Sequence, residues 1–381
     1  MEERSKDARG GAGIAMTAEQ RLHWLRLART DGIGPSTFRA LINRFGTAAA
    51  ALDALPDLAA RAGRRRVRIP DSDAIRREAD ALQRFGGQLV CSNEPDYPPA
   101  MRLFDAAPMV LSVVGDPAIL RRPTIGMVGS RDASVSSVKL ARQFAAALGE
   151  GGFAVVSGLA RGIDAAAHEG SLATGTVACL AGGVNRIYPS ENEPLARRIA
   201  EGGGALVTEM PFGWQPRAKD FPRRNRIIAG IGLGLLVVDA ARRSGSLITA
   251  RIANEIGREV FAVPGSPLDP RAAGANGLIR DGATFTTEPA DVLDALAPLV
   301  ETTAKAPHAP VLEETAPVAM AAAADGSERA LVEGSLDRTP VTVDELVRHT
   351  ALPLHAVQLA LLELDLGGDL VRHGDGRVSL G

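Results

Sequence analysis

Residues 211–250 read PFGWQPRAKDFPRRNRIIAGIGLGLLVVDAARRSGSLITA and form the most informative stretch of the chain. The stretch combines a basic loop, a long apolar run and a glycine-bearing turn that leads into a helix. Residues 217–251 contain eight Lys or Arg against two acids, although the whole chain has a net charge of −2. An excess of Arg in loops at one end of a predicted sheet is typical of a polyanion site, because guanidinium groups match phosphate oxygens. The alternative interpretation, a solvated charged face, would normally mix both signs.

On both sides of this stretch, short apolar runs alternate with amphipathic segments. This alternation predicts βαβ units and therefore an α/β fold with a doubly wound, mostly parallel sheet. In such sheets ligands bind beyond the C-terminal ends of the strands. We expect strands at residues 124–129, 153–157, 176–180, 205–208, 235–239 and 260–263, and helices at residues 136–149, 163–174, 193–201, 224–229 and 246–256.

Length and composition indicate a globular protein of two or three domains, because the chain has 381 residues, of which 45% are hydrophobic. The longest apolar run, residues 227–238, is shorter than the roughly 18–20 residues that a membrane-spanning helix needs. The first 16 residues hold no hydrophobic region of the kind that a signal peptide needs. We therefore expect a cytoplasmic protein with no membrane association. Cys91 and Cys179 lack metal-ligand spacing, so neither a disulfide framework nor a zinc site is indicated.

Changes in composition divide the chain into five segments. The second segment carries thirteen Arg against eight acids, and its turn at Gly32–Pro35 either offers backbone N–H groups to phosphate or simply joins two packed helices. The fourth segment holds nine Ala and three Pro without a periodic face, which is typical of a linker. The segments are a disordered N-terminus (1–16), a helical domain like a SAM or helix-hairpin-helix module (17–88), the sheet-containing core (89–300), the linker (301–325) and a winged-helix-like domain (326–381).

The winged-helix-like domain would ordinarily be expected to bind duplex DNA. Its charges argue against this function, because residues 326–381 contain five Arg against nine acids. The helix expected at residues 354–366 would read the groove, yet it has no Lys or Arg and carries Glu363 and Asp365. Such a helix would repel phosphate. We therefore interpret the domain as a protein-contact or regulatory module.

The loops after three of the expected core strands carry glycine, serine or arginine. Backbone N–H groups and hydroxyls at the start of a helix can hold a phosphate. Glycine turns are also necessary in any doubly wound fold, so the structural interpretation remains open. A dinucleotide fingerprint and a Walker A lysine are both missing, which argues against dinucleotide or ATP binding. The loop residues are Gly129, Ser130 and Arg131 after the first core strand, Ser157, Gly158 and Arg161 after the second, and Ser244, Gly245 and Ser246 after the fifth.

Asp164 and His168 stand at i and i+4 of one expected helix, a spacing that suits either a metal site or an acid–base pair. A third ligand is missing from the sequence nearby. We therefore favour a structural pair that fixes the loop beginning at Arg161, and we expect no metal, no cofactor and no catalytic residue.

Seven motifs follow one another along the core: VGSR (128–131), SGLARGIDAAAHEG (157–170), YPSEN (188–192), FPRRNRIIAG (221–230), SGSLITA (244–250), REVFAVPG (258–265) and GANGLIRDGA (274–283). Their succession resembles that of the DprA/Smf family of DNA-processing proteins. The resemblance implies an extended Rossmann-like core that binds single-stranded DNA, protects incoming DNA during natural transformation and loads the RecA recombinase. It also implies a homodimer formed through the core, and a protein that is not an enzyme. One departure is Ser190, where some relatives carry Lys.

The expected DNA-binding residues combine the loop residues above with the basic stretch. Phe212, Trp214 and Phe221 are interleaved with the cations, and they are either stacking surfaces for bases or core residues. We expect five cations to converge on one pocket: Arg131, Lys219, Arg223, Arg224 and Arg226. The DNA-binding set is Gly129, Ser130, Arg131, Ser157, Gly158, Arg161, Lys219, Phe221, Arg223, Arg224, Asn225, Arg226, Ser244, Gly245 and Ser246.

Two further expectations concern assembly and the competing functions. Leu278, Ile279 and Phe285 lie late in the sheet, where an uncovered edge strand would invite a second copy. The enzyme alternative is a phosphoribohydrolase of related fold, whose PGGxGTxxE loop supplies a catalytic Glu; here the corresponding turn is SGSLITA, with Ala250 in place of an acid. The other alternative is a protein-interaction hub with incidental basic charge, which salt dependence of DNA binding would distinguish.

Overall fold

The computed structural model describes residues 14–63, 67–305, 312–314, 326–373 and 376–381. The chain forms two compact units, one made of residues 1–15 and 78–311 and the other of residues 16–77 and 312–381. The expected disorder of residues 1–16 and most of the expected linker at 301–325 fall outside the described residues. The first five residues of that linker are helical, because the helix before it runs to Lys305.

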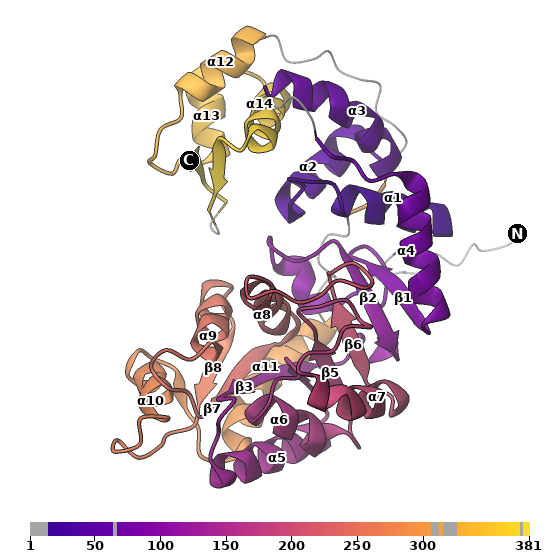
Figure 1. The fold of residues 1–381 in the computed structure, drawn as a ribbon. Coiled ribbons are helices and arrows are strands. Elements are labelled where there is room, and N and C mark those ends of the chain that lie inside the picture. Colours follow the sequence, from indigo (N-terminus) through magenta and orange to yellow (C-terminus); the bar gives the residue numbers. More distant parts are fainter. Residues whose placement is uncertain (1–13, 64–66, 306–311, 315–325, 374–375) are drawn as a thin grey trace, which may run out of the picture. The chain divides into compact units, whose positions relative to one another are not determined.

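A single mixed sheet forms the centre of the larger unit (Figure 1). Among the described residues it has nine strands in the order β1-β2-β6-β5-β4-β3-β7-β8-β9. All neighbours from β6 to β9 are parallel, whereas β1 and β2 run antiparallel at one edge. The strands are β1 (Gly87–Cys91), β2 (Val110–Gly115), β3 (Thr124–Gly129), β4 (Ala154–Ser157), β5 (Thr176–Cys179), β6 (Ala205–Thr208), β7 (Gly234–Val238), β8 (Glu259–Ala262) and β9 (Thr284–Phe285).

Helices cover both faces of this sheet, which explains why its strands are continuous apolar runs. In β7, Leu235 and Val237 pack towards the helices α8 and α9, whereas Leu236 and Val238 pack towards α5, α6 and α11 (Figure 1). The doubly wound, mostly parallel fold predicted from the sequence is therefore confirmed. The α-helices of this unit are α5 (Val135–Glu150), α6 (Ile163–Ser171), α7 (Glu193–Glu201), α8 (Asp220–Ile231), α9 (Ser246–Glu255), α10 (Ala273–Arg280) and α11 (Pro289–Lys305), and its 3₁₀ turns are η1 (Pro99–Leu103), η2 (Pro117–Arg121) and η3 (Ser190–Asn192).

Helix α8 begins four residues earlier than the sequence predicts. Pro222 lies in the first helical turn, where its missing N–H group is not needed. The Asp220 carboxylate at the start of the helix accepts hydrogen bonds from the backbone of Arg217 and the indole of Trp214, both at 2.9 Å. These bonds fold the basic loop back onto the helix that follows it.

The expected late edge strand is shorter than predicted. Leu278 and Ile279 lie in helix α10, so their assignment to an edge strand is wrong. The edge strand β9 contains only Thr284 and Phe285, and the Phe285 side chain is 57% exposed. The Gly-rich sequence around residues 274–283 fits this helix because Gly274 packs against the backbone of residues 240 and 241 without room for a side chain.

The smaller unit contains both the helical segment and the winged-helix segment, which the sequence analysis treats as separate domains. In the first, Trp24 and Phe38 are buried against each other with ring centroids 5.0 Å apart. In the second, helices pack on an antiparallel hairpin around a separate apolar core. The helices are α1 (Ala18–Ala28), α2 (Pro35–Phe45), α3 (Ala48–Arg61), α12 (Gly326–Gly334), α13 (Val343–Thr350) and α14 (Leu354–Gly367), the hairpin strands are β10 (Leu370–Arg372) and β11 (Val378–Leu380), and α4 (Ser72–Arg84) contains the boundary between the two units.

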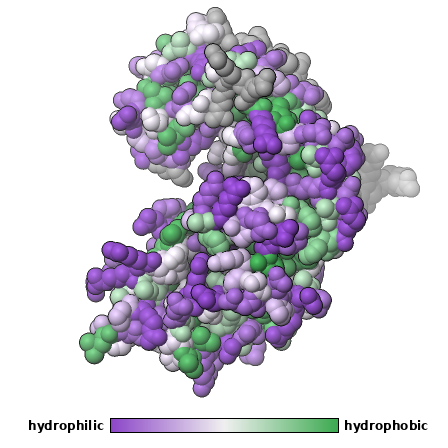
Figure 2. Space-filling model, in the orientation of Figure 1, coloured by the Kyte–Doolittle hydropathy of each residue, from purple (hydrophilic) through white to green (hydrophobic). Residues whose placement is uncertain are grey.

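Among the described residues, no helix has both the length and the apolar character that a membrane-spanning helix needs. On the face of the larger unit seen in Figure 2, hydrophilic residues predominate and hydrophobic residues are exposed in small, separate groups.

Candidate nucleic-acid interface

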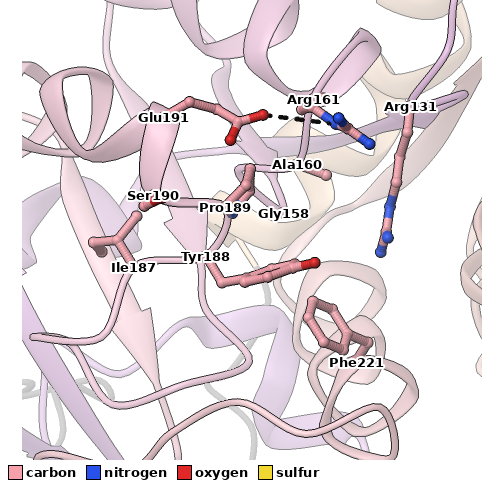
Figure 3. A pocket seen from close by; sticks show the side chains of 10 residues that line it. All are labelled: Arg131, Gly158, Ala160, Arg161, Ile187, Tyr188, Pro189, Ser190, Glu191 and Phe221. Carbon is pink, nitrogen blue, oxygen red and sulfur yellow. Dashed lines mark ion pairs between the residues drawn. The ribbon is translucent and has the colours of Figure 1, made fainter.

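A cavity of about 230 Å³ lies beyond the C-terminal ends of β3, β4 and β5, next to the start of α8 (Figure 3). We call it the aromatic cavity, because an exposed tyrosine and a phenylalanine form part of its wall. Its position agrees with the rule that ligands bind at this end of parallel strands. The lining residues are Arg131, Gly158, Ala160, Arg161, Ile187, Tyr188, Pro189, Ser190, Glu191 and Phe221.

Arg131 and Phe221 pack together at the wall of this cavity. The loop after β3 places the exposed Arg131 so that its guanidinium carbon lies 5.4 Å from the centroid of the Phe221 ring. A guanidinium stacked on a ring keeps its N–H groups directed outward in its own plane. Arg131 can therefore bind phosphate oxygen while its stem and ring contact stay in place.

Tyr188 supplies a second aromatic ring that the sequence reasoning missed. Its side chain is 54% exposed, and its ring meets Phe221 edge-on with centroids 5.5 Å apart (Figure 3). Tyr188 is the first residue of the YPSEN motif, of which the sequence analysis discusses only Ser190. A signal was present, because the chain has only two tyrosines and one of them follows a predicted core strand.

Arg161 forms the cationic rim opposite these rings. Its Nε lies 3.8 Å from Oε1 of Glu191, and both side chains are more than half exposed (Figure 3). Exposed ion pairs of this length contribute little to stability. The guanidinium of Arg161 can therefore exchange Glu191 for a phosphate at small cost.

Gly162 allows the loops after β3 and β4 to approach closely. A Cβ at this position would lie 2.3 Å from the carbonyl oxygen of Ser130, and the φ angle is +71°. Any other residue would push the two loops apart, since that φ is also unfavourable for a side chain. The glycine therefore sets the distance between the loops that carry Arg131 and Arg161.

Arg224 lies inside the fold below the cavity. Its Nη1 donates to the carbonyl oxygens of Gly158 and of Cys179, the latter at 2.7 Å. Burial lowers the pKa of Arg224, while the nearby Asp164 raises it. Ser157 is likewise buried and donates to the Met127 carbonyl at 2.6 Å. The structure thus gives Arg224 and Ser157 the role of tying strand ends together, and both are out of reach of a phosphate chain on the surface.

Arg223 and Arg226 both form ion pairs with one buried acid, Glu209. The distances from their Nη2 atoms to Glu209 Oε2 are 2.8 Å and 2.5 Å. The Arg226 side chain is only 14% exposed, and burial lowers its pKa while Glu209 raises it. The Arg223 side chain remains half exposed.

The five basic residues therefore do not converge on one pocket as the sequence predicts. Arg131 lines the aromatic cavity, whereas the other four do not. Lys219 is exposed just before α8, and Arg223 one turn into the helix is exposed beside its partner acid. Charge alone could not reveal which cations are exposed. Arg226 is held by Glu209, and Arg224 is held by carbonyl groups at strand ends that lie far from it in the sequence.

The remaining predicted residues meet at the junction of β3 and β7, where the strand order reverses. The backbone N–H of Ser130 donates to the Asp239 carbonyl at 2.8 Å, and the hydroxyls of Ser244 and Ser246 lie 2.7 Å apart. Asn225 from α8 donates to the Gly245 carbonyl at 3.4 Å. Gly129 cannot carry a side chain, because its Cβ would lie 2.2 Å from the Val238 carbonyl oxygen. This junction is the usual ligand crevice of a doubly wound sheet.

Asp164 and His168 take part in internal hydrogen bonds. Asp164 accepts from the backbone N–H of Ala160 at 3.3 Å, and His168 Nδ1 lies 2.7 Å from the hydroxyl of Thr176. Burial lowers the pKa of His168 to about 3, so the imidazole is neutral at ordinary pH. Within the described residues, no group of three or more His, Cys, Asp or Glu side chains could hold a metal ion. Cys91 and Cys179 are buried and are not joined in a disulfide, and burial raises the pKa of Cys179 to about 12.

Of the three aromatic residues considered from the sequence, only Phe221 lines the cavity. Phe212 packs edge-on against Phe85 at 5.6 Å. Trp214 is bonded to Asp220, and the guanidinium of Arg217 lies 4.6 Å from its ring centroid. The interpretation as structural residues therefore holds for Phe212 and Trp214.

Three family models match this chain. The model described as DNA recombination-mediator protein A matches residues 88–297. The DprA-like N-terminal HHH domain matches residues 18–81, and the DprA winged helix domain matches residues 315–376. The first match alone spans more than half of the chain, and it covers every residue of the aromatic cavity.

Related proteins and structures agree with these matches. Protein Smf of Escherichia coli is 42% identical over 217 residues, which is 56% of this chain and 58% of that protein. Protein Smf of Synechocystis is 30% identical over 93% of this chain and 97% of its own length. The structure of DNA processing protein A from Streptococcus pneumoniae has a TM-score of 0.58 at 29% identity, over 74% of this chain and 98% of that one. A structure of DNA processing protein A from Helicobacter pylori, whose subject is its single-stranded DNA binding mode, has a TM-score of 0.51 at 25% identity. It covers 56% of this chain and 96% of that one.

Proposed function

Because this chain belongs to the family of DNA recombination-mediator protein A, also called DprA or Smf, we propose that it binds single-stranded DNA through the aromatic cavity. The single observation that carries the proposal is the placement of Arg131, Tyr188 and Phe221 around one opening at the ligand-binding end of the sheet. The Helicobacter pylori relative is described as binding single-stranded DNA, which supports the same ligand for this chain.

The chemistry of the cavity suits an unpaired strand. Binding single strands without sequence preference requires cations along the phosphates and aromatic faces on which bases stack. Arg131 and Arg161 supply two exposed guanidinium groups, and Tyr188 and Phe221 supply two rings between them. In a duplex the base faces are already stacked, so only an unpaired base can use these rings. The cavity therefore favours single strands over duplex.

Three further groups have separate roles in this proposal. The exposed Lys219 and Arg223 extend the phosphate contacts along the start of α8. The hydroxyl groups of Ser130, Ser244 and Ser246 at the β3–β7 junction, beside Gly129 and Gly245, donate hydrogen bonds to a neighbouring phosphate. The positioning residues are Ser157, Gly158, Arg224, Asn225 and Arg226.

The resemblance to the family extends the proposal to the cellular role. We infer that the protein acts in the cytoplasm, protects incoming DNA during natural transformation and hands the strand to RecA. We also infer a homodimer formed through the core. The two-residue edge strand β9, with Phe285 exposed, supports such an interface, because an uncovered edge can pair with a second copy.

We propose that the protein binds its nucleic acid without chemical change. In the enzyme alternative, a phosphoribohydrolase, an acid would be required at position 250. Ala250 is fully buried in α9 and packs in the core, so an acid could not be accommodated there without a rearrangement. Incubation of the pure protein with nucleoside monophosphates tests this directly, and release of free base would favour the enzyme.

The binding proposal is tested by competition between single and double strands. Labelled oligo-dT bound to the full-length protein is challenged with unlabelled single strands or with a duplex of equal length at several salt concentrations. We expect single strands to compete at least about tenfold better than duplex, because only they stack on the rings. Equal competition by both, with a purely salt-dependent affinity, would mean that the basic charge acts without the cavity.

A further inference from the structure

Helix α14 of the winged-helix segment has two apolar stripes on different sides. Residues spaced i, i+3, i+4 and i+7 share one face of a helix. Val357, Ala360, Leu361 and Leu364 follow this spacing, and so do Leu359, Leu362, Glu363 and Leu366. All eight side chains are buried. Because both stripes are buried, other parts of the chain must cover the helix on both of these faces.

The first stripe forms the core of the winged-helix segment itself. It packs with Val332 of α12, Leu346 of α13 and the hairpin residues Leu370 and Val378. The members of the second stripe are not part of this core. Their burial therefore requires a different cover.

That cover is the helical segment from the other end of the chain. Helix α14 packs against α2 and α3. The Thr37 hydroxyl on α2 donates to the Asp365 carboxylate at 2.8 Å. At the end of α14, a Cβ added to Gly367 would lie 3.4 Å from the carbonyl oxygen of Ala62, the residue after α3. The two helices thus pack against α14, and the named contacts lie near its C-terminal end.

Polar groups inside this contact also join the two segments. The Arg329 guanidinium on α12 donates to the carbonyl of Arg61, at the end of α3. Glu363 is buried in the second stripe, and the charges of Arg329 and Arg61 act on it. Desolvation raises the pKa of Glu363. Arg61 belongs to the helical segment and Glu363 to the winged-helix segment, so this electrostatic interaction crosses the contact.

Glu314 makes a further connection. Its Oε1 accepts from the Trp24 indole of α1 and from the backbone N–H of Ala48, each at 2.8 Å, and its Oε2 accepts from Gln20 at 3.0 Å. Ala48 is the first residue of α3, so the carboxylate lies at the positive end of that helix. The short described stretch 312–314, just before the winged-helix segment, is thereby fixed to the helical segment.

We propose that the outward face of α14 is an intramolecular docking surface, occupied by α2 and α3 of the same chain, so that the helical and winged-helix segments act as one module. In this arrangement the helix that would read a DNA groove is covered. The winged-helix segment does not bind duplex DNA while it is docked, and its protein contact is the helical segment.

Cysteine cross-linking in the full-length protein tests the docking. In the double variant Thr37→Cys, Asp365→Cys, mild oxidation should form a bond within one chain, detected by peptide mapping. The native cysteines do not interfere because both are buried. The control pair is Thr37→Cys with His355→Cys, since His355 is exposed and lies ten residues, or about 15 Å, along the helix from position 365. Absence of the 37–365 bond, or its formation between two chains, would overturn the proposal.

Hydrogen exchange gives an independent readout. Leu362→Glu places a charge in the second stripe, and Gln358→Glu places the same charge at an exposed position of the same helix. We expect amides of α2 and α3 to exchange at least about tenfold faster in Leu362→Glu only, because they lose their cover. Unchanged protection of α2 and α3 in Leu362→Glu would refute the docking. If that variant unfolds the winged-helix core as well, the cross-link alone decides.

Discussion

The guanidinium carbon of Arg131 lies 5.4 Å from the centroid of the Phe221 ring, and this pair joins the loop after β3 to the start of α8. The two residues are far apart in the sequence, yet they provide side by side the two groups that an unpaired nucleotide needs. One is a cation for its phosphate, and the other is a ring for its base. The exposed Tyr188 completes the wall.

Removing either ring should weaken the binding of single strands. We expect Phe221→Leu and Tyr188→Leu each to cost about 1–3 kcal/mol of binding free energy, the usual contribution of one stacked base. Fluorescence anisotropy with oligo-dT measures the loss. Phe212→Leu is the matched control, because Phe212 packs on Phe85 outside the cavity. Equal losses in all three variants would show that the aromatic residues act only through stability.

Arg226→Ala should destabilise the fold. The substitution removes the more deeply buried of the two Arg side chains that pair with the buried Glu209. Breaking a buried pair typically costs about 3–5 kcal/mol, and the partial exposure of this pair reduces that figure. Chemical denaturation measures it. Arg223→Ala should cost less than Arg226→Ala, and the opposite order would contradict the assignment of Arg226 as a positioning residue.

Gly162→Ala should disturb the loops that carry Arg131 and Arg161. Its Cβ would overlap the Ser130 carbonyl, in addition to the unfavourable φ of +71°. Gly213→Ala is the control, because its φ of +83° is equally unfavourable but no atom lies within 4 Å of the added Cβ. We expect about 1–2 kcal/mol of destabilisation for the control and clearly more for Gly162→Ala. Equal losses in the two variants would mean that the loops are not in close contact.

His168 should make stability depend on pH. Burial lowers the folded-state pKa of His168 from 6.5 to about 3. Between these values the unfolded chain binds more protons, so the contribution of His168 is fully present above pH 6.5 and is lost as the pH falls towards 3. Burial raises the pKa of Asp164, so protonation of Asp164 favours the folded state as the pH falls. This effect is present in wild type and in His168→Asn alike. The stability difference between wild type and His168→Asn, measured by denaturation, should therefore shrink from pH 7 to pH 4. A constant difference would contradict this.

The strands of the core could be predicted almost to the residue, because they are buried on both faces and read as short apolar runs. The order of the strands could not be predicted, since it depends on pairings between distant segments. The basic stretch contains Phe221, which lines the cavity, but α8 begins four residues earlier than predicted. Glu209 and the carbonyls that hold Arg224 lie at the ends of other strands. Charge counts therefore overstated how many cations are exposed.

Tyr188 and the outward stripe of α14 show a different limit. Tyr188 lies in a loop without periodicity, so only its neighbours in space reveal it as part of a cavity. The lack of Lys and Arg in α14 was readable from the sequence, and so were its acids Glu363 and Asp365. The partner that covers it, α2 with α3, comes from the opposite end of the chain and became visible only in the folded structure.

The most direct measurement of the central claim is the salt dependence of single-strand affinity for wild type and Arg131→Ala, with the exposed Arg197→Ala on α7 as the control. The logarithm of the affinity should fall linearly with the logarithm of the salt concentration, by about 0.7 per phosphate contacted. We predict that Arg131→Ala binds all sequences more weakly and has a slope shallower by about 0.7, whereas Arg197→Ala matches wild type. An Arg131→Ala protein with the affinity and slope of wild type would contradict the assignment of the aromatic cavity as the DNA site.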